Sequence, residues 1–128
     1  MAEQLQPVRV PSGWRIDWNT LFDLEPTEEN ARRGYFGGSS LFLATHEQRR
    51  FQIDVEWRPE DDPGGRYEMR VEYAPWLRTD RGRRRKGPAP AFRDAELVHE
   101  FQTRSRAELV QELETWLLHC AEWVREGS

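Results

Sequence analysis

Four carboxylates stand at alternating positions of two segments joined by a short turn. They are Asp54 and Glu56 in the first segment, and Glu68 and Glu72 in the second. Alternate residues of a strand point to the same face, so a hairpin would bring the two pairs side by side. Such a surface could hold a metal ion, supply a general acid–base pair, or attract a cationic protein.

These uses differ in what else they require. A metal ion needs more converging oxygens than two strands without a ligand-rich loop supply, so we predict no metal site. A plainer alternative is a solvated sheet face on which Arg58 and Arg70 act as cross-strand partners. The third is a negative surface, extended by the acids of the turn at 60–65, that attracts a basic protein such as a nuclease.

A basic loop over 77–93 is the second charged feature. Residues 78–86 hold six basic residues and one acid, so this segment carries +5 and the rest of the chain −9, within a net charge of −4. Arg83, Arg84 and Arg85 are consecutive and could neutralise phosphates. Binding of single strands also wants aromatic residues between the charges, whereas Trp76 and Phe92 only flank the loop. A solvated loop, contact with an acidic protein and contact with nucleic acid all stay open.

The remaining reactive residues predict neither a catalytic site nor a cofactor. The three histidines are far apart in sequence. Cys120 lies on the apolar stripe of an expected helix, and its neighbour His119 diverges from it by about 100° around the axis. The Gly-rich segment 34–40 lacks the lysine of a phosphate-binding loop and is expected to be a flexible entry to a strand. We therefore expect a protein that is not an enzyme.

A chain of 128 residues predicts a single domain, 1–128, with an irregular lead-in over 1–12. Aromatic residues make up 12% of the chain, which indicates a folded core rather than disorder. A single cysteine permits no internal disulfide, and no apolar run reaches the roughly 18 residues that a membrane span needs. The N-terminal segment lacks the apolar region of a secretory signal. We expect a cytoplasmic protein without a membrane partner.

Five segments have the alternation or the composition of strands: 14–18, 40–46, 49–59, 66–76 and 96–104. In the first, the alternation places Trp14, Ile16 and Trp18 on one face. The links between most segments are short, which predicts an antiparallel meander.

Two segments have the signals of helices. Near 27–33, Thr27 is a plausible N-cap and Gly34 a stop. A longer helix begins after Ser105, which has the capping-box spacing to Glu108, and its apolar residues from Leu109 to Val124 form one stripe. The predicted class is α+β: a sheet of four to five antiparallel strands packed against one long C-terminal helix, plus the short helix.

Three stretches carry a resemblance to a known family: GYFGGSSLF at 34–42, RRFQIDVEWRPEDDPGGRYEMRV at 49–71 and FQTRSRAELVQELETWL at 101–117. In pattern they resemble small bacterial immunity proteins of polymorphic-toxin and contact-dependent inhibition systems. The resemblance implies a cytoplasmic, non-enzymatic protein that binds and blocks one cognate toxin domain.

For such a contact we predict the four carboxylates as the charged surface and Trp76 as an aromatic anchor, because aromatic anchors and charge complementarity dominate many interfaces. Trp57 and Tyr73 are weaker anchor candidates, since both fall on the inward face of their strands. We add Arg83, Arg84 and Arg85 to the partner-binding residues. The alternative function is a nucleic-acid-associated accessory protein that uses the basic residues of 78–86.

Overall fold

The computed structural model describes residues 4–75, 92–93 and 95–123. Five strands form one antiparallel sheet in the order β1-β2-β3-β4-β5, so every strand pairs with its neighbours in the chain. The strands are β1 (Trp14–Asn19), β2 (Phe42–His46), β3 (Phe51–Arg58), β4 (Arg66–Tyr73) and β5 (Glu96–Thr103). Two helices complete the fold: α1 (Glu28–Arg32) and α2 (Arg106–Ala121). The predicted α+β class and meander are confirmed.

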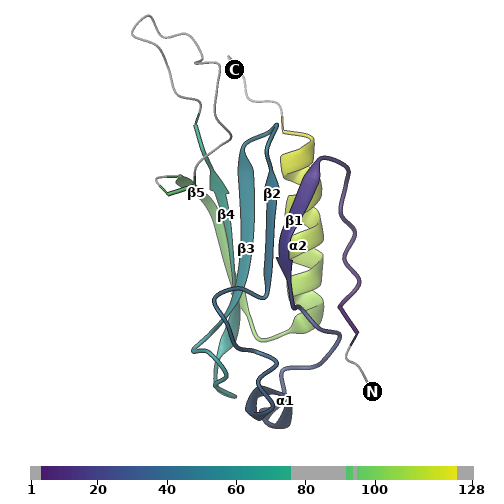
Figure 1. Cartoon of the computed structure of the whole chain (residues 1–128), viewed down its shortest axis with the longest axis vertical. Helices are drawn as coiled ribbons and strands as arrows, with labels where there is room; N and C mark the ends of the chain where they lie inside the picture. The colour runs from purple at the N-terminus through teal and green to yellow at the C-terminus, as the bar shows by residue number, and fades with distance from the viewer. Residues whose placement is uncertain (1–3, 76–91, 94, 124–128) are drawn as a thin grey trace, which may run out of the picture.

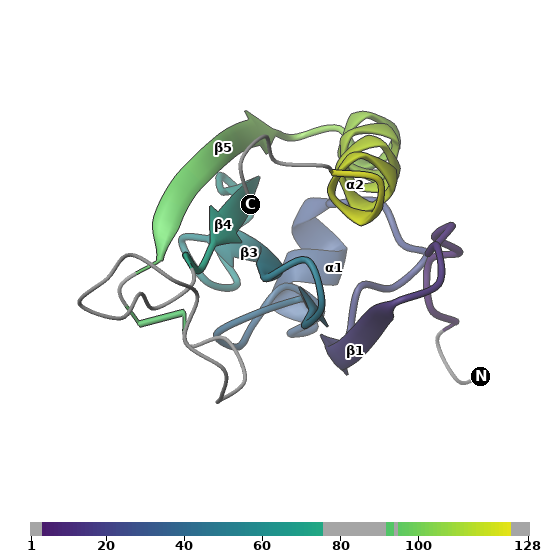
Figure 2. The same cartoon turned by 90° about the horizontal axis from the view of Figure 1, so that it is seen from above.

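The sheet is curved, and α2 lies across its concave side (Figure 1 and Figure 2). Burial alternates strictly along β3, where Phe51, Ile53, Val55 and Trp57 are buried and the residues between them are half-buried. The same alternation continues in β4 from Tyr67 to Tyr73. From α2, the side chains of Leu109, Leu113, Leu117 and Cys120 close the core. The sheet therefore has an apolar concave face and a polar convex face, as period-two patterning requires.

Strand β1 departs from the expected alternation. Ile16 pairs with Ala44, but Trp18 pairs with Leu43, so Asp17 is an extra residue that forms a β-bulge. The bulge places Trp18 in register with a convex-face residue instead of on the face of Trp14, and 53% of its surface is exposed. The prediction that Trp14, Ile16 and Trp18 share one face was wrong for Trp18, because a single inserted residue reverses the facing of the residues after it.

Strand β1 is held to the helix by the indole of Trp14, whose Nε1 donates a hydrogen bond of 2.9 Å to the carbonyl oxygen of Leu117. The lead-in before β1 also contacts α2, since the backbone N–H of Arg9 donates to Oε2 of Glu114 at 2.7 Å. These contacts close the concave side of the sheet at its β1 edge, opposite the edge formed by β5 (Figure 2).

The start of α2 is capped as its sequence predicts, but only in part. The hydroxyl of Ser105 accepts a hydrogen bond of 3.2 Å from the backbone N–H of Glu108. The return bond of a capping box is replaced, because the N–H of Ser105 donates to Oγ1 of Thr103 at 3.0 Å, and this hydroxyl in turn contacts Glu108 at 3.2 Å. Thr103 therefore stands between the two residues that the motif would join directly.

Candidate functional site

The four predicted carboxylates lie together on the convex face of β3 and β4, on the side away from α2. Strands β3 and β4 pair so that Glu56 stands opposite Glu68, Asp54 opposite Arg70, and Gln52 opposite Glu72. All four carboxylate residues are half-buried. Neighbouring strands bring residues on the same face close together, so this grouping follows from the alternation in the two segments.

Two of these carboxylates have a cation on the same strand. Arg58 Nη2 lies 2.5 Å from Oε1 of Glu56, and Arg66 Nη2 lies 3.4 Å from Oε2 of Glu68. Arg58 also donates to the backbone carbonyls of Gly38 and Ser39, at 3.1 and 2.9 Å. Its guanidinium thus binds the loop before β2 as well as the carboxylate of Glu56. The four residues Asp54, Glu56, Glu68 and Glu72 together form a surface called here the carboxylate face.

Asp54 and Glu72 differ from the other two. Among the described residues, no cation lies within ion-pair distance of either carboxylate. Burial, reinforced by a hydrogen bond with Glu56 and by the charges of Glu56 and Glu72, raises the pKa of Asp54 to about 7. A hydrogen bond of 2.7 Å from the hydroxyl of Ser40 to Oδ1 of Asp54 acts in the opposite direction. The carboxyl of Asp54 therefore titrates close to neutral pH, and a nearby positive charge would favour its ionised form.

Trp76 and Arg83, Arg84 and Arg85 lie outside the described residues, as does most of the basic loop 77–93. Of that loop, Phe92 is described, and it lines a shallow hollow of about 210 Å³ on the convex face together with Leu43, Thr45 and Gln52. Trp57 and Tyr73 are buried on the concave face, which confirms their assignment to the core.

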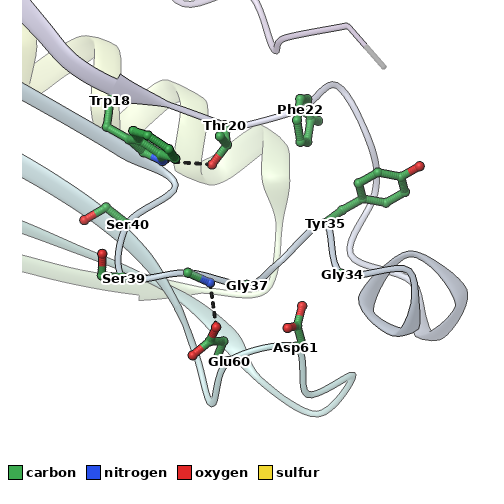
Figure 3. A pocket seen from close by; sticks show the side chains of 11 residues that line it. Trp18, Thr20, Phe22, Gly34, Tyr35, Gly37, Ser39, Ser40, Glu60 and Asp61 are labelled. Atoms are coloured by element: carbon green, nitrogen blue, oxygen red, sulfur yellow. Dashed lines mark hydrogen bonds between the residues drawn. The ribbon is translucent and has the colours of Figure 1, made fainter. Parts of the chain in front are cut away.

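A second hollow, of about 480 Å³, opens next to the carboxylate face at the end of the sheet near α1 (Figure 3). It was not predicted as a site. Its lining comes from β1 and the segment after it, from the Gly-rich segment 34–40, and from Glu60 and Asp61 in the turn between β3 and β4. The Gly-rich segment thus forms a wall of the hollow in addition to leading into β2.

Each of the three histidines packs against a tryptophan, and the cysteine lies in the core. The ring of His99 stacks on Trp116 at 4.4 Å between centroids, and its Nε2 lies 3.6 Å from Oε1 of Glu112. Cys120 is buried in the core as predicted, and burial raises the pKa of its thiol to about 12. Within the described part of the chain, no group of three or more His, Cys, Asp or Glu side chains is arranged to hold a metal ion.

The chain was compared with known proteins in three ways. A scan against protein-family models, a search of curated proteins and a search of solved structures each found no match. Among the described helices, none has the length and apolar character needed to cross a bilayer.

Proposed function

We propose that this chain is a non-enzymatic inhibitor of the immunity-protein type, which binds a basic cognate toxin domain in the cytoplasm through its carboxylate face. The observation that carries the proposal is the pairing of Glu56 with Glu68 across two central strands. Like charges placed directly opposite each other destabilise a sheet. Arg58 and Arg66 offset part of that repulsion, and a basic partner that supplies further cations to this face would offset more of it.

The other two members of the carboxylate face support the same function. Asp54 and Glu72 have no cation at ion-pair distance among the described residues, although Arg70 stands directly opposite Asp54 in the sheet. Electrostatic complementarity of this kind speeds association and selects partners by charge. It also predicts that binding is weakened by salt, because exposed charges are screened within about 10 Å at 0.1 M ionic strength.

The proposal is tested by capture followed by a defined binding measurement. Tagged protein is used to capture partners from a nuclease-treated lysate of the source cells, and the recovered partner is then purified and titrated. The test variant is Asp54→Asn with Glu72→Gln, which removes charge at nearly constant volume. The matched control is Glu96→Gln with Glu122→Gln, where both residues are exposed.

We expect the partner to be a basic toxin domain whose activity stops at equimolar inhibitor. The test variant should bind roughly tenfold or more weakly and the control within about twofold of the parent, because charge pairs at interfaces couple by more than about 1.4 kcal/mol. Equal affinity of both variants would contradict the assignment of the face. A captured partner with no toxic activity would contradict the assignment of the function.

A further inference from the structure

The hollow of about 480 Å³ is built from segments that are distant in the sequence. Trp18, Thr20 and Phe22 form one side, and the loop from Gly34 to Ser40 forms the opposite side (Figure 3). Glu60 and Asp61 close it from the turn after β3. Its volume falls within the range of about 300–1,000 Å³ that small-ligand sites occupy.

One side of the hollow is aromatic. The indole N–H of Trp18 donates to Oγ1 of Thr20 at 3.2 Å, which fixes the ring at the rim while 53% of the residue stays exposed. Phe22 and Tyr35 meet edge to face, with 5.8 Å between their centroids. An exposed indole held in one orientation offers its π face, and a cation is attracted to such a face.

The wall formed by the turn after β3 is acidic. The Oε1 atom of Glu60 accepts a hydrogen bond of 2.7 Å from the backbone N–H of Gly38 (Figure 3). The carboxylate of Asp61 lies so close to Gly37 that a Cβ there would come within 2.7 Å of Oδ2. In the described part of the chain, no lysine, arginine or histidine forms an ion pair with Glu60 or Asp61. The hollow therefore combines two carboxylates that lack a counter-ion with the faces of aromatic rings.

We propose that this hollow binds an arginine side chain presented by the protein partner. A planar guanidinium can stack on an aromatic ring and donate bidentate hydrogen bonds to a carboxylate at its edge, which matches the two sides of the hollow. An anion is disfavoured by the two carboxylates, and the N–H of Gly38 that would receive it already donates to Glu60.

The hollow and the carboxylate face form one continuous surface. Trp18 pairs with Leu43, and Leu43 pairs with Asp54, so the three lie in a row across β1, β2 and β3. Ser40 lines the hollow and donates its hydroxyl hydrogen to Asp54. That the arginine belongs to a protein partner rests on the proposed function. Binding of a guanidinium group in the hollow does not depend on that function.

The test uses the intact chain and the probe N-acetyl-Gly-Arg-Gly-amide, followed by the indole N–H resonance of Trp18 in NMR titrations. The control probe carries citrulline, which keeps the shape of arginine and lacks its charge. The test variants are Trp18→Leu, Glu60→Gln and Asp61→Asn. Glu60→Gln keeps an oxygen for the N–H of Gly38, and Asn tolerates the positive φ of 54° at position 61. Glu96→Gln is the matched charge control.

We expect the arginine probe to shift the Trp18 resonance in a saturable way that weakens with salt, and the citrulline probe to cause no shift. Each test variant should bind the arginine probe about three- to fivefold more weakly than the parent, and Glu96→Gln should bind it with unchanged affinity. For Trp18→Leu, which lacks the indole, binding is followed through the arginine side-chain resonances of the probe. Absence of a saturable shift, or equal binding of citrulline, would overturn the inference and leave the carboxylate-face test untouched. If the variant Asp54→Asn with Glu72→Gln lost the captured partner but still bound the arginine probe, the hollow would be shown to bind a guanidinium independently of the carboxylate face.

Discussion

The hydroxyl of Ser40 donates a hydrogen bond of 2.7 Å to Oδ1 of Asp54, and this bond joins the loop before β2 to the centre of β3. It opposes the effect of burial on the pKa of Asp54, because a donor favours the charged form of a carboxyl. The protonation of one face residue is thus linked to the position of the loop that also lines the hollow.

The first prediction concerns the pH dependence of stability. In the unfolded chain Asp54 titrates near pH 4, and in the folded protein near pH 7. Between these values the unfolded state releases a proton that the folded state keeps, so the free energy of unfolding falls as the pH rises. We expect Asp54→Asn to remove this fall, which is on the order of a few kcal/mol, in urea unfolding at pH 5 and pH 8.

The second prediction uses Ser40→Ala to test the same contribution of Asp54 to the pH dependence of stability. Loss of the hydroxyl removes a donor that lowers the pKa of Asp54, so the fall in stability should extend to higher pH. Glu100→Gln, an exposed position on β5, should leave the profile of the parent unchanged. A profile that is equally steep in Asp54→Asn would assign the dependence to another residue.

A third prediction concerns the packing of Trp57. A Cβ at Gly65 would lie 2.5 Å from Nε1 of Trp57 and 2.8 Å from the backbone oxygen of Arg58. Gly65→Ala should therefore destabilise the fold by about 1–3 kcal/mol, the range for overpacked cores. Gly64→Ala is the matched control, because the nearest atom there, at 3.3 Å, belongs to the exposed side chain of Asp62. Thermal unfolding of the two variants makes the comparison, and equal melting temperatures would contradict it.

A fourth prediction compares two leucines of α2. Leu113 is fully buried against the sheet, whereas 49% of the surface of Leu118 is exposed. Leu113→Ala should cost about 2–5 kcal/mol of unfolding free energy, and Leu118→Ala within about 0.5 kcal/mol. Urea titration separates the two, and similar losses would place the helix in a different rotation about its axis.

A fifth prediction concerns the cap of α2. Ser105→Ala removes the acceptor for the N–H of Glu108 and should cost about 1 kcal/mol. Glu108→Ala, which removes the acceptor of a reciprocal capping box, should cost less, because the N–H of Ser105 is satisfied by Thr103 and not by Glu108. If the two substitutions were equally costly in urea unfolding, the reciprocal capping box would exist in solution after all.

Sequence periodicity predicted the elements whose burial is regular. The strands β3 and β4 alternate without interruption, and the apolar spacing of α2 marks the face that meets them. Strands β3 and β4 also carry the carboxylate face, which is why Asp54, Glu56, Glu68 and Glu72 could be grouped from the sequence alone. Local pattern is sufficient where each residue has one facing and neighbouring strands succeed each other directly in the chain.

The hollow could not be predicted in the same way. A bulge at Asp17 turns Trp18 toward the convex side, and an alternating sequence gives no sign that one of its residues will be inserted as a bulge. The walls of the hollow come from segments that are brought together only by the tertiary fold. The one available signal was the density of glycine beside acids and aromatic residues, since Gly34 and Gly38 adopt φ values of 84° and 88°.

The position of α2 after all five strands bears on how the chain emerges from a ribosome. Because each strand pairs with its neighbour, the meander can assemble progressively during synthesis. Its concave side, with Phe51, Ile53, Val55 and Trp57, then stays open to solvent until the last helix has been made. For that interval the nascent protein presents an apolar sheet to its surroundings, a state in which chains are prone to aggregate.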